Sequence, residues 1–211
     1  MAIVNMTNLP PSEKQAGYVA RLEERLGQLA ALPDLKDEFR QRLNKLLSNE
    51  TEDISERITA LLSMIGSVAR QYLSTGDVLE LGESDRPIAV IGIVGDKLDR
   101  VIMRTNGKIQ REGELFPVTL DEISNSRKFS QEEIDHSEEL QKMRLTALRW
   151  KAIKIAEERM KIHSKGHSLA GKMRIIAQKI AKDIVPHYQV DPSLVNLESV
   201  DNALVAYFLN H

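Results

Sequence analysis

The chain contains no cysteine, and aromatic residues make up only 4% of its 211 residues. Without a thiol it cannot form a disulfide, use cysteine as a nucleophile, or hold zinc or an iron–sulfur cluster through cysteine ligands. Hydrophobic residues account for 42% of the chain, so a core of ordinary size is expected. With so few rings, that core must consist mainly of aliphatic side chains, a mixture that favours packed helices over a large β-sandwich.

Long apolar runs are also missing from the sequence. The longest, residues 88–94, has the length of a β-strand, whereas a membrane-spanning helix needs about 20 apolar residues. Residues 1–11 carry neither a basic start nor an apolar stretch and do not have the pattern of a signal peptide. The sequence therefore predicts a soluble, cytoplasmic protein that does not bind a membrane.

Three runs of apolar residues in the first third of the chain recur at intervals of three and four, the period of one face of a helix. Ser12 and Gln15 have the spacing of a capping box, Pro33 and Asp34 follow the first run, and Gly76 follows the third. The same spacing also fits an intermolecular coiled coil, but each run covers only about two to three heptads. We therefore expect three helices in an intramolecular bundle, with the coiled coil as the alternative. The apolar positions are Val19, Leu22, Leu26 and Leu29; Leu35, Phe39, Leu43, Leu46 and Leu47; and Ile54, Ile58, Leu61, Ile65, Val68 and Tyr72.

The pattern changes to that of strands after residue 77. Residues 88–94 are rich in β-branched side chains and predict a strand, followed by a loop at 95–99 and a strand at 101–103. Asn106-Gly107 predicts a hairpin with a type I′ turn that leads into a strand at 109–111. Shorter strands are expected at 78–81 and 115–118. The acidic residues near the turns, Asp96, Asp99, Glu112 and Glu114, are interpreted as solubilising charges.

Helical signals return after residue 118. Ser130 and Glu133 form a second predicted capping box, and because neither proline nor glycine interrupts residues 131–165, we expect one helix roughly 50 Å long. Gly166 ends it. The remaining cap signals are Thr119 with Glu122 for a short helix, Ser168 for a helix that ends at Pro186, and Asp191-Pro192 for a last helix with Val200, Leu204 and Phe208 on its inner side.

These patterns together predict an α+β, helix-dominated fold. The N-terminal helical unit would occupy residues 1–76, a small antiparallel β-meander residues 77–118, and a C-terminal helical unit, built on the long helix, residues 119–211.

Charge is distributed unevenly along the last third of the chain. The net charge of the whole chain is −2, yet residues 141–182 contain 12 basic and 2 acidic side chains, and the segments on either side are acidic. Such a basic surface can neutralise the phosphates of a nucleic acid, or it can pair with the acidic segments within or between subunits. The candidate nucleic-acid-binding residues are Arg149, Lys154, Lys161, Lys165, Lys172, Arg174, Lys179 and Lys182.

Other motifs in the sequence are weak. No zinc finger or RNP-like aromatic motif is present, so any contact is expected with the nucleic-acid backbone and not with bases. The helices on either side of Gly166 match a helix-turn-helix poorly because the first is too long. His163 and His167 lack a third ligand, and Glu133 with His136 lacks the second Glu-x-x-His pair of a di-iron bundle. We expect no metal, no cofactor and no catalytic residue.

The leading hypothesis is a non-enzymatic subunit of a larger assembly, which contacts nucleic-acid backbone or an acidic partner through helices within residues 141–182. The alternative is a protein-interaction adaptor, chaperone or oligomeric scaffold that binds no nucleic acid. An enzyme with a site on the sheet is the third hypothesis. The expected partners are therefore a nucleic acid, another protein, or a second copy of the chain.

Overall fold

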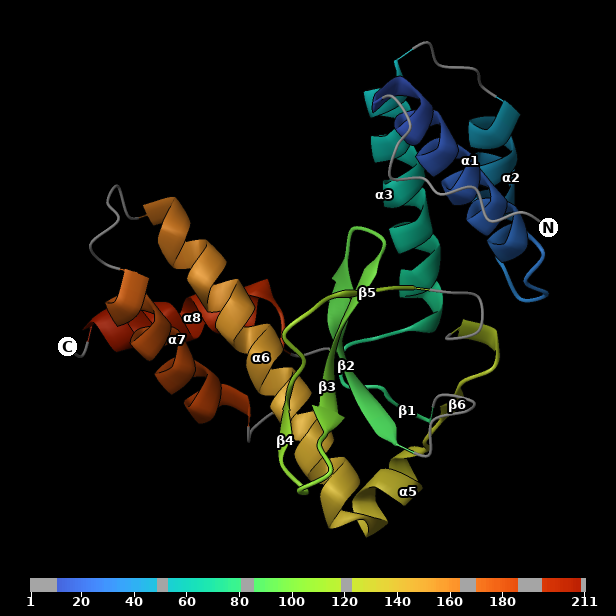
Figure 1. Ribbon diagram of the computed structural model, residues 1–211. Helices are drawn as coiled ribbons and strands as arrows, with labels where there is room; N and C mark the ends of the chain where they lie inside the picture. The colour runs from blue at the N-terminus through green and yellow to red at the C-terminus, as the bar shows by residue number, and fades with distance from the viewer. Residues whose placement is uncertain are drawn as a thin grey trace. The chain divides into compact units, whose positions relative to one another are not determined.

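The computed structural model describes residues 11–48, 53–80, 86–118, 123–163, 170–185 and 195–209. Within them the chain forms seven helices and a six-stranded antiparallel sheet (Figure 1), which confirms the helix-dominated α+β fold. The helices are α1 (Pro11–Ala30), α2 (Asp37–Ser48), α3 (Ile54–Tyr72), α5 (Gln131–His136), α6 (Glu138–His163), α7 (Ala170–Ile184) and α8 (Leu197–Leu209). The strands are β1 (Val78–Glu80), β2 (Pro87–Val94), β3 (Lys97–Met103), β4 (Ile109–Arg111), β5 (Phe116–Pro117) and β6 (Arg127–Lys128).

The chain divides into two compact units. Unit 1 comprises residues 1–72, 93–97 and 117–125, and unit 2 comprises residues 73–92, 98–116 and 126–211. No helix in the described parts of the chain is long and apolar enough to span a membrane.

Unit 1 is built on the predicted helical bundle. Helix α1 packs against α2 and α3, which also pack against each other. About half of the predicted stripe positions are buried, and the others are half-buried; the buried ones are Leu22, Leu26, Leu29, Leu35, Leu43, Leu61, Ile65 and Val68. Helix α1 begins at Pro11, so the prediction of Ser12 as its N-cap is wrong. Asp53 caps α3, because its carboxylate accepts hydrogen bonds from the amides of Ser55 and Glu56 at 2.7 and 3.2 Å.

Unit 1 also contains a buried arginine, Arg57, a half-buried one, Arg25, and a close backbone contact at Gly66. Arg57 donates to the carboxylate of Glu23 at 2.6 Å, while Arg25 donates to Asp96 at 2.7 Å and to the carbonyl of residue 118. Asp96 is buried, so its interpretation as a solubilising charge is wrong. Helix α3 approaches the 93–97 turn so closely that a Cβ atom on Gly66 would lie 2.0 Å from the carbonyl oxygen of Gly95.

The sheet has the order β4-β3-β2-β1-β6, and β5 pairs with β3. The predicted meander of neighbouring strands is thus present, with β6 as an edge strand that the sequence did not indicate. Strand β3 already begins at Lys97, because Gly95, with φ 60°, allows a tight two-residue turn at residues 95–96. The predicted loop at 95–99 is therefore too long.

The β3–β4 hairpin lies where Asn106-Gly107 predicted it, but its turn differs. Gly107 has φ 75°, whereas Asn106 does not have positive φ, so the type I′ turn is wrong. The amide of Gly107 donates to the carbonyl of Arg104 at 2.9 Å, and the amide of Arg104 donates to the carbonyl of Lys108 at 3.0 Å. This pattern is that of a three-residue loop in which one glycine alone takes the left-handed conformation.

The single long helix predicted at 131–165 is two helices. The Ser130 capping box is confirmed, with Glu133 as its partner, and opens α5. Ser137 then adopts an extended conformation, φ −119° and ψ 109°, which ends α5 after one and a half turns. Its hydroxyl accepts a hydrogen bond from the amide of Leu140 at 3.3 Å and caps α6. Helix α6 has 26 residues and is therefore about 39 Å long.

Helix α6 is the central element of unit 2, since it carries buried side chains on two sides. Met143 and Ala147 pack with Val78 and Val101 of the sheet, whereas a second set, including Leu148, Ala152, Ile155 and Ala156, packs with α7 and α8. A helix that is buried on both sides has no single apolar stripe.

The last helix also differs from its prediction. Helix α8 begins at Leu197, where Asn196 and Ser199 exchange capping hydrogen bonds of 3.1 and 3.2 Å. Val200 and Leu204 are buried as expected, but Phe208 is 59% exposed and does not belong to the inner side. The predicted signals at Thr119, Glu122, Gly166, Ser168, Pro186 and Asp191-Pro192 lie outside the described residues.

Candidate nucleic-acid interface on unit 2

The basic segment at residues 141–182 falls on α6 and α7, two helices of unit 2 that pack against each other. Of the eight candidate residues, Arg149 and Lys154 lie on α6 and Arg174, Lys179 and Lys182 on α7, all with described side chains. Lys161 and Lys172 also belong to these helices, but their side chains lie outside the description, as does the whole of Lys165. The helix packing brings cations from two sequence segments onto one unit.

Part of the basic segment is already paired with acidic groups. Lys142 forms an ion pair with Glu138 one helical turn earlier, which holds the pKa of Glu138 below its ordinary value. Arg159 donates to Asp201 of α8 at 2.7 Å, and this hydrogen bond raises the pKa of the Arg159 guanidinium. The internal-pairing alternative therefore accounts for some of the cations.

Other members of the segment bind polar or aromatic groups. Buried Arg144 donates to the side chain of Gln131, and the ammonium of Lys179 lies 5.0 Å from the centre of the Tyr207 ring. The latter is a cation–π contact.

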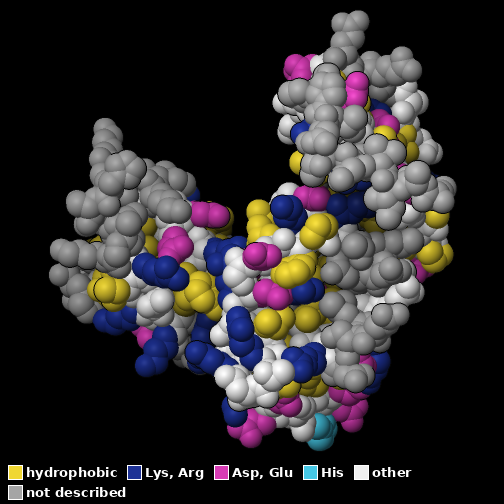
Figure 2. Space-filling model, viewed as in Figure 1, with side chains coloured by type: hydrophobic (Ala, Val, Ile, Leu, Met, Phe, Trp, Pro, Cys, Tyr) yellow, Lys and Arg dark blue, Asp and Glu magenta, His cyan; other side chains and the backbone are white. Residues whose placement is uncertain are grey.

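Three candidate residues have exposed side chains. Arg149, Arg174 and Lys182 are exposed, and none of them forms an ion pair with any residue in the ranges that the structure describes. Lys and Arg side chains are frequent on the face of unit 2 that Figure 2 shows. These three residues give α6 and α7 an exposed positive charge that no acidic segment of the described chain neutralises.

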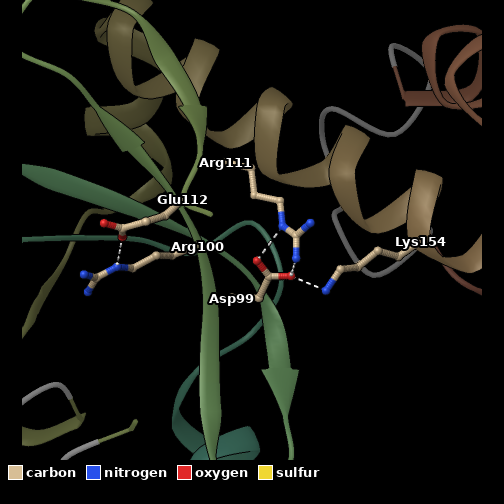
Figure 3. A network of polar contacts seen from close by, with 5 residues as sticks. All are labelled: Asp99, Arg100, Arg111, Glu112 and Lys154. Carbon is tan, nitrogen blue, oxygen red and sulfur yellow. Dashed lines mark hydrogen bonds and ion pairs between the residues drawn. The ribbon is translucent and has the colours of Figure 1, made fainter. Parts of the chain in front are cut away.

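Lys154 belongs to a cluster around a buried carboxylate, drawn in Figure 3. The side chain of Asp99, on β3, is 0% exposed and accepts hydrogen bonds from Arg111 of β4 and from Lys154 of α6. The guanidinium of Arg111 also lies 5.3 Å from the ring centre of Trp150 on α6. A buried charge must be paired, and here two cations pair with one carboxylate, so the cluster carries a net charge of +1.

A second ion pair lies beside this cluster. Arg100 donates to Glu112 at 2.6 Å, and its guanidinium lies 3.8 Å from the ring centre of Phe116. Because successive side chains of a strand alternate between its faces, Arg100 points away from the α6 side to which Asp99 points (Figure 3). Since Asp99 is buried, its interpretation as a solubilising charge is wrong; it is part of the contact between α6 and the sheet.

Sequence reasoning missed Arg111 as a member of this cluster. The signal available in the sequence was an acidic–basic dipeptide on one predicted strand and a basic–acidic dipeptide after it. Asp99-Arg100 lies on β3, and Arg111-Glu112 lies at the end of β4, so opposite charges can pair between the neighbouring strands. Two cross-strand ion pairs result, one on each face.

The described residues do not bring together the side chains that a metal site would need. Within them no three His, Asp or Glu side chains come together as a metal site would require. Glu133, which has Glu-x-x-His spacing with His136, completes the Ser130 capping box. The amide and hydroxyl of Ser130, with Arg127, hold the pKa of Glu133 below its ordinary value. His167 and the side chain of His163 lie outside the description.

The comparisons with known proteins give no further guide to function. The chain matched none of the protein families, curated proteins or solved structures against which it was compared.

Proposed function

We propose that the protein is a non-enzymatic subunit of a larger assembly and that unit 2 contacts the phosphate backbone of a nucleic acid. The observation that supports this most directly is the presence of Arg149, Arg174 and Lys182 as exposed cations, without ion pairs in the described chain, on two helices that pack together. Phosphate contacts of this kind carry affinity but no sequence information, which agrees with the lack of a base-reading motif.

The buried carboxylates on the sheet are poor candidates for acid–base catalysis. Asp96 is bound by the guanidinium of Arg25, and Asp99 is bound by the guanidinium of Arg111 and the ammonium of Lys154. Oxygens that already accept from cationic donors are not presented to a substrate, which is why a binding role is preferred to an enzyme with a site on the sheet.

The test is binding of a fluorescently labelled duplex and of a labelled single strand over a series of salt concentrations, followed by anisotropy. The wild-type affinity should fall steeply as salt rises, because each phosphate contact releases bound counterions. Changing Arg149, Arg174 and Lys182 together to Gln should lower the slope of log affinity against log salt by about 2 to 3, at about 0.9 per contact on duplex DNA.

A matched triple variant controls for net charge. Lys36, Arg42 and Lys45 are exposed cations of unit 1, and changing them to Gln alters the net charge equally. This control should keep most of the wild-type slope. Absence of binding at low salt, or equal losses in the two triple variants, would refute the proposed function.

The adaptor or scaffold hypothesis is favoured by a different feature, the exposed apolar side chains of α8. Leu197, Val205, Phe208 and Leu209 are all more than half exposed, and such side chains are frequent at protein contacts. Sedimentation over a range of concentrations tests self-association. A monomer at all concentrations, with unchanged behaviour after Val205→Ser and Phe208→Ser, would argue against an oligomeric scaffold.

A further inference from the structure

The cluster around Asp99 has more donors than its carboxylate uses. Arg111 donates from Nε to Oδ1 at 2.9 Å and from Nη2 to Oδ2 at 3.2 Å, while Lys154 donates from Nζ to Oδ2. A guanidinium has five N–H groups and an ammonium three. Three N–H groups of the Arg111 guanidinium, two on Nη1 and one on Nη2, and two of the Lys154 ammonium therefore remain for another acceptor.

The side chains that carry these remaining donors are partly accessible to solvent. The side chains of Arg111 and Lys154 are 30% and 27% exposed, whereas that of Asp99 is 0% exposed. Figure 3 shows Arg111 and Lys154 both directed at the carboxylate of Asp99. Because the two cations are partly exposed and the carboxylate is not, a solvent-borne group would meet positive charge before it met the carboxylate. The excess of one positive charge selects an anion.

The spacing of the two cations fits one tetrahedral oxyanion. Nη2 of Arg111 and Nζ of Lys154 both bond to Oδ2 of Asp99, so they lie within about 6 Å of each other, twice the length of a long hydrogen bond. Donors that far apart can each reach a different oxygen of one phosphate group. A guanidinium is also the side chain best suited to phosphate, since its planar fork offers parallel donors.

The two cations are held in place without the anion. Asp99 fixes Arg111 through both of its oxygens, and the ring of Trp150 lies 5.3 Å from the Arg111 guanidinium. Lys154 is fixed by the same carboxylate. Side chains that are already ordered lose little conformational entropy on binding, and this raises affinity.

We propose that Arg111 and Lys154 form a phosphate-binding subsite and that Asp99 is the positioning residue that holds both cations. The subsite adds a specific phosphate contact to the proposed function. It rests on that function in one respect, namely that the phosphate belongs to a nucleic-acid backbone. A free phosphate or phosphate monoester offers the same chemistry, and the experiment separates the two sources.

The first arm uses inorganic phosphate alone and reads the Arg111 Nε–H resonance of the full-length protein by NMR. Phosphate should shift this resonance with saturation, while chloride at equal ionic strength should not. Lys154→Gln should weaken the apparent affinity about tenfold, the loss of one charge-assisted hydrogen bond. Lys142→Gln is the matched control, because it removes a lysine from the same helix whose partner is the exposed Glu138.

Asp99→Asn distinguishes positioning from simple charge. If only net charge mattered, this variant would bind phosphate more tightly, because it removes a negative charge. The positioning role predicts weaker binding, since the amide of Asn offers only one acceptor oxygen where Asp99 offers two to Arg111 and Lys154. Should Asp99→Asn not fold, Arg111→Lys replaces it: this variant keeps the charge but lacks the planar fork, and it should bind several-fold more weakly.

The second arm measures the labelled single strand and duplex with the same variants. If nucleic acid binds with a salt-dependent affinity but Lys154→Gln behaves like Lys142→Gln in both arms, the subsite is refuted and the proposed function stands. If phosphate binds as expected and nucleic acid does not, the subsite holds a free phosphate group and the proposed function is refuted. A phosphate shift that equals the chloride shift overturns the subsite directly.

Discussion

The close approach of Gly66 to the 93–97 turn allows a quantitative test of unit 1. A Cβ atom at Gly66 would lie 2.0 Å from the carbonyl oxygen of Gly95, whereas ordinary contacts begin at 3.4 Å. Gly66→Ala therefore requires the two backbones to separate by the difference, about 1.4 Å. Neither atom belongs to a flexible side chain that could rotate away, so the core of unit 1 must shift.

Two effects of opposite sign determine the outcome for Gly66→Ala. Alanine in place of glycine stabilises a helix interior by about 1 kcal/mol, while overpacking costs about 1–3 kcal/mol and occasionally more. Because the clash is between backbones, we take the upper end and expect a net loss of about 2 kcal/mol in the free energy of unfolding. Gly27 of α1 is the matched control, since a Cβ there has no atom within 4 Å, and Gly27→Ala should stabilise by about 0.5–1 kcal/mol.

The assay is urea unfolding followed by far-UV circular dichroism, in which a shift of the midpoint at constant slope reports stability. The two variants should move the midpoint in opposite directions and differ by about 3 kcal/mol. If Gly66→Ala is as stable as Gly27→Ala, the close approach of α3 to the turn is refuted.

Three further perturbations test the caps, turns and buried charges. The pKa of Glu133 is held below its ordinary value mainly by Ser130. The contribution of ionised Glu133 to the stability of the fold is therefore present above the ordinary glutamate pKa and is lost as pH falls through the lower pKa of the folded state. Ser130→Ala should raise the pKa of Glu133 part of the way back in an NMR titration, and no change would contradict the capping box. Gly107→Ala should cost about 1 kcal/mol in thermal unfolding, because φ is 75° while the space around it is open, whereas Gly113→Ala, equally open and without positive φ, should cost almost nothing; equal effects would contradict the turn assignment. Arg57→Met should destabilise by about 2–3 kcal/mol in urea, since it removes the charged donor of a buried hydrogen-bond set; a loss below about 0.5 kcal/mol, the range of ordinary surface changes, would contradict it.

The helices of the bundle could be predicted because their signal is local. Core-facing side chains recur with the period of the helix, and Leu22, Leu26 and Leu29 are buried as that period requires. The Ser130 capping box is equally local, since its two members are three residues apart.

Errors arose where two local arrangements compete for the same residues. Ser137 is compatible with a helix interior, yet its hydroxyl also caps α6, and the chain turns there without proline or glycine. Asn106 tolerates the left-handed conformation, but the hairpin places only Gly107 in it. In both cases the packing of the neighbouring elements selects between conformations of similar free energy, and a sequence window does not contain that information.

The site could be predicted only in part, for the same reason. The basic character of α6 and α7 is a matter of composition and was evident from the sequence. Which cations are paired depends on residues far apart in the chain: Lys154 and Asp99 are 55 positions apart, and Arg159 and Asp201 are 42 apart. Only the packing of α6 on the sheet and on α8 brings these charges together.

The position of α6 between two hydrophobic cores has a spectroscopic consequence. Trp150, the only tryptophan of the chain, packs against the core shared with the sheet and also against the core shared with α7 and α8. Its fluorescence therefore reports on both cores at once. Loss of either should shift its emission to longer wavelength, and a single transition in emission would mean that the sheet, α7 and α8 unfold cooperatively through the helix they share.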